Sequence, residues 1–146
     1  MIRTIKGEIT MEQNLKELLL KDLCARLPYG VKIELTPVTK GKCVTLTLMI
    51  LRDYFIFDNV NYLPYLRPMS SMTEEEKEEM HNLLSPEGTA IYKNEGIAIP
   101  LNHCGDWVSY EFMNRIIDYL NAHHFDYRGL IDKNLALDCT GLHIYD

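Results

Sequence analysis

The sequence has no long apolar run and no paired cysteines. Its densest apolar segment, Val44 to Leu51, is interrupted by Thr45 and Thr47, and it is far shorter than the roughly 20 residues that a membrane-spanning helix needs. The N-terminal residues contain neither a long apolar core nor a small-residue cleavage site, so they do not resemble a secretory signal. The four cysteines lie far apart, which disfavours a disulfide framework. We therefore expect a cytoplasmic protein with reduced thiols and no membrane association.

Common catalytic and cofactor-binding motifs are also missing. The chain holds no Gly-x-Ser-x-Gly elbow, no phosphate-binding loop and no dinucleotide fingerprint. His103, Cys104 and Asp106, together with His123 or His124, are residue types that bind zinc. Their spacing matches neither a His-Glu-x-x-His helix nor a pair of cysteine knuckles. We expect no metal site, no cofactor and no assignable catalytic residue, and these absences argue against the common enzyme classes.

The composition is that of an ordinary globular protein. Apolar residues make up 47% of the 146 residues and charged residues 25%, which argues against extended disorder. The length suits one hydrophobic core, and no repeat or flexible linker divides the chain, so we predict a single domain over residues 1–146. A net charge of −6 disfavours nucleic acid as a partner. We expect a monomer or a small homo-oligomer.

Three segments have the pattern of a helix. Thr10 and Gln13 have the spacing of a capping box, and the predicted first helix ends at Leu27-Pro28. Thr73 and Glu76 form a second capping box and predict a shorter helix to about Leu84. The clearest amphipathic pattern is the third, which runs from near Asp106 to about Phe125.

Strand patterns occupy much of the first half of the chain. Apolar and polar residues alternate over Val31–Leu35 and again over Cys43–Leu51, and Tyr54–Phe57 is an aromatic run. Two prolines make Asn61–Pro68 an irregular connector, and a short hairpin is expected around Asn94-Glu95-Gly96. The prediction is therefore an α+β fold, in which a three-stranded antiparallel meander is packed by N- and C-terminal amphipathic helices and a short helix lies in the middle of the chain.

The largest concentration of polar and aromatic groups lies at the end of the third predicted helix. It comprises His123, His124, Asp126, Tyr127 and Arg128. These residues could converge on a binding or catalytic site. The interpretation that we favour is a structural helix end, with imidazoles near the last carbonyls, Asp126 and Arg128 as a local clasp, and a left-handed exit at Gly129.

A second candidate surface is the proline-flanked connector. Tyr62, Tyr65 and Arg67 are residue types that are enriched at protein interfaces. The alternative is that the tyrosines cover the edge of the sheet, because a tyrosine can bury its ring and keep its hydroxyl hydrated.

Three stretches of the chain also carry a resemblance. Leu20–Val31, Leu63–Glu76 and the region from Asp118 to Leu137 resemble a group of small proteins encoded by gut bacteria and their phages or prophages. That group has no established function, so the resemblance implies a mobile-element context and brings no functional residues. We expect a non-catalytic accessory or regulatory protein that acts through protein contacts. The alternative is a small hydrolase that uses His123 or His124 with nearby acids.

Overall fold

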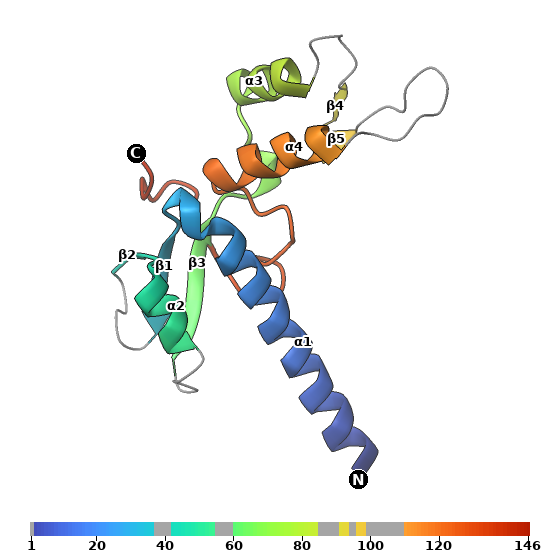
Figure 1. Ribbon diagram of the computed structural model, residues 1–146, viewed down its shortest axis with the longest axis vertical. Helices are drawn as coiled ribbons and strands as arrows, with labels where there is room; N and C mark the ends of the chain where they lie inside the picture. The colour runs from blue at the N-terminus through green and yellow to red at the C-terminus, as the bar shows by residue number, and fades with distance from the viewer. Residues whose placement is uncertain (1, 37–41, 55–59, 85–90, 94–95, 99–109) are drawn as a thin grey trace. The chain divides into compact units, whose positions relative to one another are not determined.

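The computed structural model describes residues 2–36, 42–54, 60–84, 91–93, 96–98 and 110–146 (Figure 1). The chain forms two compact units, and each is described separately below. Unit 1 comprises Met1–Leu66 with Arg128–Asp146, and unit 2 comprises Arg67–Tyr127. Helices and a mixed sheet confirm the α+β class. The prediction of a single domain stays a prediction.

Unit 1 holds a four-stranded sheet in the order β2-β1-β3-β6. The strands β2, β1 and β3 pair antiparallel, whereas β3 and β6 pair parallel. In chain order its elements are α1 (Ile2–Arg26), the 3₁₀ turn η1 (Leu27–Tyr29), β1 (Lys32–Thr36), β2 (Val44–Thr45), α2 (Leu48–Tyr54), β3 (Asn61–Leu66) and β6 (Leu137–Asp138).

Unit 2 is built mainly from two helices. In chain order its elements are the 3₁₀ turn η2 (Met69–Ser71), α3 (Glu74–Leu84), β4 (Ile91–Lys93), β5 (Gly96–Ala98) and α4 (Tyr110–Ala122). The antiparallel pairing of β4 with β5 confirms the predicted hairpin.

The predicted meander is wrong in its strand order. The first predicted strand, observed as β1, lies where the alternating pattern put it. The strand β1 lies between β2 and β3, so consecutive strands do not follow one another across the sheet. The parallel partner β6 comes from a distant part of the chain that has no strand-like pattern.

The second predicted strand, Cys43–Leu51, is also wrong, because its last residues, Leu48–Leu51, belong to a helix. Only Val44–Thr45 is a strand, and α2 follows after Thr47. The Thr47 hydroxyl accepts a hydrogen bond from the Ile50 amide at 3.3 Å, and the Thr47 carbonyl accepts one from the Leu51 amide at 2.9 Å. A side-chain oxygen that satisfies an early helix amide is what begins a helix. Of the third predicted strand, Tyr54 ends α2 and residues 55–57 lie outside the described residues.

The segment predicted as an irregular connector is largely the strand β3. Pro64 is tolerated in β3 because its main-chain nitrogen does not face the neighbouring strand β1. The Leu66 carbonyl accepts a hydrogen bond from the Cys139 amide at 2.9 Å, so Leu66 faces the β6 side. Alternate strand residues face the same way, so Pro64 also faces that side and its missing N–H removes no bond to β1.

The helices follow the sequence more closely. The Thr73 hydroxyl accepts from the Glu76 amide and the Glu76 carboxylate accepts from the Thr73 amide, both at 3.2 Å, which confirms the predicted capping box of α3. The predicted start of the first helix at Thr10 is wrong, because α1 begins at Ile2. The last helix, α4, ends at Ala122 rather than near Phe125. Its predicted first residues, 106–109, lie outside the described residues.

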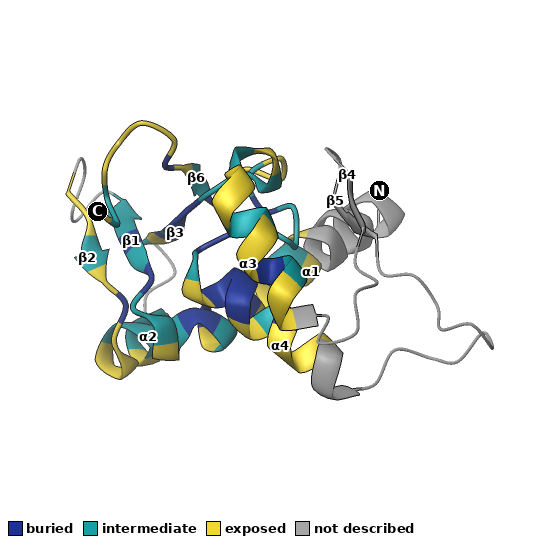
Figure 2. Ribbon diagram, turned by 90° about the horizontal axis from the view of Figure 1, so that it is seen from above, coloured by how far each residue is buried: buried dark blue, intermediate teal, exposed yellow. Residues whose placement is uncertain are grey.

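Each unit has its own apolar core (Figure 2). In unit 1, Leu19 and Leu23 of α1 pack with Val31, Ile33 and Leu66. In unit 2, the buried residues are Met72, Met80, Ile116, Tyr119, Leu120 and Phe125. Among the described residues no helix is both long enough and apolar enough to cross a membrane.

A tyrosine hydroxyl completes the ladder between β1 and β3. Ile33 pairs with Pro64, so the next pair in the antiparallel register is Lys32 with Tyr65. The Tyr145 hydroxyl lies between them. It accepts from the Lys32 amide at 2.9 Å and donates to the Tyr65 carbonyl at 2.7 Å. The C-terminal segment is thereby held to the sheet of unit 1.

Candidate functional site

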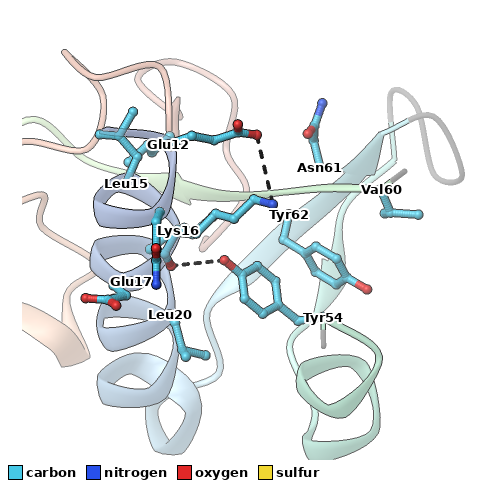
Figure 3. Close-up of a pocket in the computed structure, with 12 residues that line it drawn as sticks. Glu12, Leu15, Lys16, Glu17, Leu20, Tyr54, Val60, Asn61 and Tyr62 are labelled. Atoms are coloured by element: carbon cyan, nitrogen blue, oxygen red, sulfur yellow. Dashed lines mark hydrogen bonds and ion pairs between the residues drawn. The ribbon is translucent and has the colours of Figure 1, made fainter. Parts of the chain in front are cut away.

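A groove of about 460 Å³ lies in unit 1 between α1 and the beginning of β3 (Figure 3). The lining comes from α1, from the end of α2, from Val60 and the first residues of β3, and from Leu135. The lining residues are Glu12, Gln13, Leu15, Lys16, Glu17, Leu19, Leu20, Tyr54, Val60, Asn61, Tyr62 and Leu135.

The groove exists because the apolar face of α1 is only partly covered. Leu19 and Leu23 are buried in the core, as residues four apart on one helix face should be. Leu15 and Leu20, to either side, remain partly accessible. Glu12 and Leu20 are eight residues apart, so at 1.5 Å per residue the groove follows α1 for about 12 Å.

Two tyrosines form one side of the groove (Figure 3). The Tyr54 hydroxyl donates to the Lys16 carbonyl at 3.0 Å and so ties the end of α2 to α1. The rings of Tyr54 and Tyr62 meet edge to face, with centroids 5.2 Å apart and planes at 75°, an arrangement that the charge distribution of aromatic rings favours. The pair gives this side of the groove a fixed shape.

The electrostatics of the groove keep both phenols neutral. Burial, and then the neighbouring Tyr62, raise the pKa of Tyr54. Burial, and then the Asp53 carboxylate, raise the pKa of Tyr62. On the rim, the Lys16 ammonium lies 4.0 Å from the Glu12 carboxylate, and both side chains are well exposed. Leucines and tyrosines make up much of the described lining, so the arrangement suits binding of apolar groups.

The cluster at the end of α4 forms a helix-terminating turn in unit 2. The Phe125 amide donates to the Leu120 carbonyl at 2.9 Å and the His124 amide donates to the Asn121 carbonyl at 3.1 Å. These two bonds define a Schellman motif, in which the residue after the C-cap is left-handed. That residue is the buried His124, with φ 62°. The predicted exit from the helix at Gly129 is therefore wrong, although Gly129 is left-handed further along the chain.

The histidines and their neighbours in unit 2 make contacts close to the end of α4. The His123 ring stacks on Tyr119 with centroids 4.0 Å apart, and its Nδ1 lies 3.0 Å from the Tyr119 carbonyl oxygen. The Tyr127 hydroxyl donates to the Asn121 side chain at 2.9 Å, and the Asp126 amide donates to the Arg67 carbonyl at 2.8 Å. These contacts satisfy a helix end and the turn after it.

Arg128 belongs to unit 1, where it accompanies a buried ion pair. The Arg26 Nε donates to the Asp22 carboxylate at 2.7 Å, and both side chains are completely buried. The Arg128 Nε lies 3.4 Å from the other oxygen of the same carboxylate. The hypothesis of a clasp between Asp126 and Arg128 stays a prediction, because the structure documents a different acid, Asp22, beside the guanidinium.

The connector residues have structural contacts. The Arg67 guanidinium binds both oxygens of Glu76 at 2.7 Å and lies 4.2 Å from the Phe125 ring centroid, all within unit 2. Burial alone would raise the pKa of Glu76, but the hydrogen bonds from Arg67 and Thr73 and the guanidinium charge outweigh it, so the pKa is lowered. Tyr65 is buried and its carbonyl accepts from Tyr145. Of Tyr62, Tyr65 and Arg67, it is Tyr62 that lines the groove.

Sequence reasoning did not identify the other groove residues. Leu15 and Leu19 lie within the first predicted helix, but a helical pattern does not reveal which of its positions stay partly exposed. Tyr54 was placed in a strand, so its contact with Lys16 was not foreseen.

Comparisons of the chain with protein-family models, with curated proteins and with solved structures find no match. The metal-ligand candidates His103, Cys104 and Asp106 lie outside the described residues.

Proposed function

We propose that the protein is a non-catalytic accessory or regulatory protein, and that the groove of unit 1 binds an apolar segment of a partner protein. The groove itself is the observation that supports the proposal. Leucines and tyrosines line it, and charged side chains of α1 stand on its rim. An apolar centre with a polar rim is the usual organisation of a protein-binding surface.

The length of the groove favours a protein segment over a compact metabolite. The lining follows α1 for more than two helical turns, from Glu12 to Leu20. Binding of an apolar stretch along such a groove is a common mode of peptide recognition. The hydrolase alternative stays a prediction, since the described contacts of His123 and His124 are those of a helix end.

The resemblance to small proteins of gut bacteria and their phages agrees with an accessory role. We place the protein in the cytoplasm, as a monomer or a small homo-oligomer, and its charge of −6 makes nucleic acid an unfavourable partner.

Site-specific photocrosslinking tests the proposal. A photoreactive phenylalanine analogue at Asn61, which is exposed and lines the groove, should crosslink one or a few host proteins in cells. The same analogue at Asn14 is the matched control, because Asn14 is exposed on α1 but does not line the groove. Mass spectrometry of the adducts then identifies the partner and the crosslinked segment.

Purified partner provides the quantitative test. Leu20→Glu places a charge against the apolar segment and should weaken binding at least tenfold, while Asn14→Glu should change it less than twofold. Circular dichroism establishes that both variants are folded. Equal binding by both variants would refute the groove as the site, and a co-purifying small molecule displaced by Leu20→Glu would replace the protein partner with a ligand.

A further inference from the structure

The strand β2 is an edge of the sheet of unit 1, and its outward main-chain groups can be identified from the ladder. The sheet order places β2 beside β1 alone. The Leu46 amide donates to the Val31 carbonyl at 2.9 Å, so Leu46 faces β1. Because facing alternates along a strand, Val44 also faces β1, and the N–H and C=O groups of Cys43 and Thr45 face outward.

This edge is accessible. Cys43 and Thr45 are both exposed, and none of the described strands pairs with their outward side (Figure 2). Outward N–H and C=O groups on an edge strand are a template for pairing with another extended chain. The edge is therefore suited to bind another chain in an extended conformation.

Two features next to the edge indicate which side chains such an extended chain would carry. Leu48 and Met49, the first residues of α2, are 72% and 66% exposed. An exposed apolar pair beside an open edge offers a contact for apolar side chains. Lys42 is exposed, and the Lys32 ammonium lies over this strand, 2.7 Å from the Thr45 hydroxyl. Two lysines therefore contribute positive charge beside this edge.

We propose that the outer edge of β2 binds an extended, apolar and acidic segment of another protein, which adds to the sheet as a strand beside Cys43–Thr45. The main chain of that segment pairs with the outward groups, its apolar residues contact Leu48 and Met49, and its carboxylates meet Lys32 and Lys42. The same lysines oppose pairing between two copies of this chain, because such pairing would bring like charges together. The surface is separate from the groove residues, so its test is independent of the groove.

A peptide library tests the proposal with the full chain. Each nine-residue peptide has valine at every second position. The positions between the valines hold acidic residues in one set of peptides, basic residues in a second and hydroxyl residues in a third, and binding is measured by fluorescence polarisation. Acidic peptides should bind at least tenfold more tightly than basic ones. Bound peptide should also slow hydrogen exchange of the Cys43 and Thr45 amides.

Two matched changes examine the main-chain pairing. Thr45→Pro removes an outward N–H without removing a bond to β1, and should weaken acidic-peptide binding at least tenfold. Thr45→Val keeps that N–H and should stay within twofold of the unmodified protein. If Thr45→Pro does not fold, an acidic peptide N-methylated at alternate amides tests the same bond from the other side, and its unchanged affinity would refute the proposal. Equal binding of acidic and basic peptides would also overturn the proposal. So would a dimer of the free protein that Thr45→Pro dissociates, because the edge would then bind a second copy of this chain.

Discussion

Replacing Tyr145 with phenylalanine removes one hydroxyl and two hydrogen bonds in unit 1. The hydroxyl bridges the Lys32 amide at 2.9 Å and the Tyr65 carbonyl at 2.7 Å, where a direct rung of the ladder would otherwise lie. Each hydrogen bond contributes about 1 kcal/mol net, so we expect Tyr145→Phe to lower the free energy of unfolding by about 2 kcal/mol. For a chain of this size that loss lowers the melting temperature by about 4–8 °C.

Urea and thermal unfolding, followed by circular dichroism, measure the effect. Leu142→Ala is the matched control in the same C-terminal segment, because Leu142 is 55% exposed, and it should change the free energy by less than about 0.5 kcal/mol. If Tyr145→Phe is as stable as the unmodified protein, the hydroxyl bridge between β1 and β3 does not stabilise the fold.

An alkaline titration examines the same hydroxyl independently. Burial raises the pKa of Tyr145 well above its ordinary value, which is about 10 in an unfolded chain. Below about pH 10 the phenol is protonated in both states, so its contribution to stability is complete. Above that pH the unfolded state ionises first and the contribution is lost as the pH rises. The stability difference between the unmodified protein and Tyr145→Phe should therefore narrow above about pH 10, and a constant difference would contradict the reasoning.

Two further predictions concern unit 2. Glu76→Gln should cost about 1.5–3 kcal/mol at neutral pH, because Arg67 loses a charged hydrogen-bond partner. Because the pKa of Glu76 is lowered in the folded protein, this contribution to stability is present above about pH 4.3 and is lost as the pH falls further. The difference in unfolding free energy between the two proteins, measured with urea, should therefore disappear in acid. A difference that remains at pH 2 would argue against the ion pair. His124→Gly should be more stable than His124→Ala by about 1 kcal/mol, because both lose the imidazole but only glycine adopts the left-handed conformation without strain. Equal stability of these two variants would show that the left-handed turn is not strained.

Local features were predictable where neighbouring residues supply the interaction. The capping box of Thr73 and Glu76 needs only two side chains three residues apart, and it formed as the sequence indicated. The alternation that predicted β1 depends on one buried face, which β1 has at Ile33. Both patterns concern contacts that the local segment determines.

The errors arose where distant residues decide the structure. Alternation over Cys43–Leu51 suggested a strand, but Thr47 caps a helix and leaves Leu48 exposed. Pro64 suggested irregular backbone, but its register beside β1 and the position of β6 make the missing N–H harmless. The groove was not predictable for a similar reason, since partial exposure of Leu15 depends on how closely β3 and α2 approach α1. Sequence periodicity identifies a face and does not say how completely another element covers it.

The parallel pairing of β3 with β6 has a consequence for synthesis and folding. Unit 2 lies in the chain between these two strands, so unit 1 is assembled from two separate stretches of sequence. Closing so long a loop costs conformational entropy before any contact compensates for it, and pairing between distant residues slows folding. Because chains emerge from the ribosome N-terminal end first, β3 must wait for all of unit 2 before β6 and Tyr145 can reach it. During that interval the edge of β3 that later receives β6 has no strand beside it, so nascent chains are most vulnerable to misassociation just before unit 1 is complete.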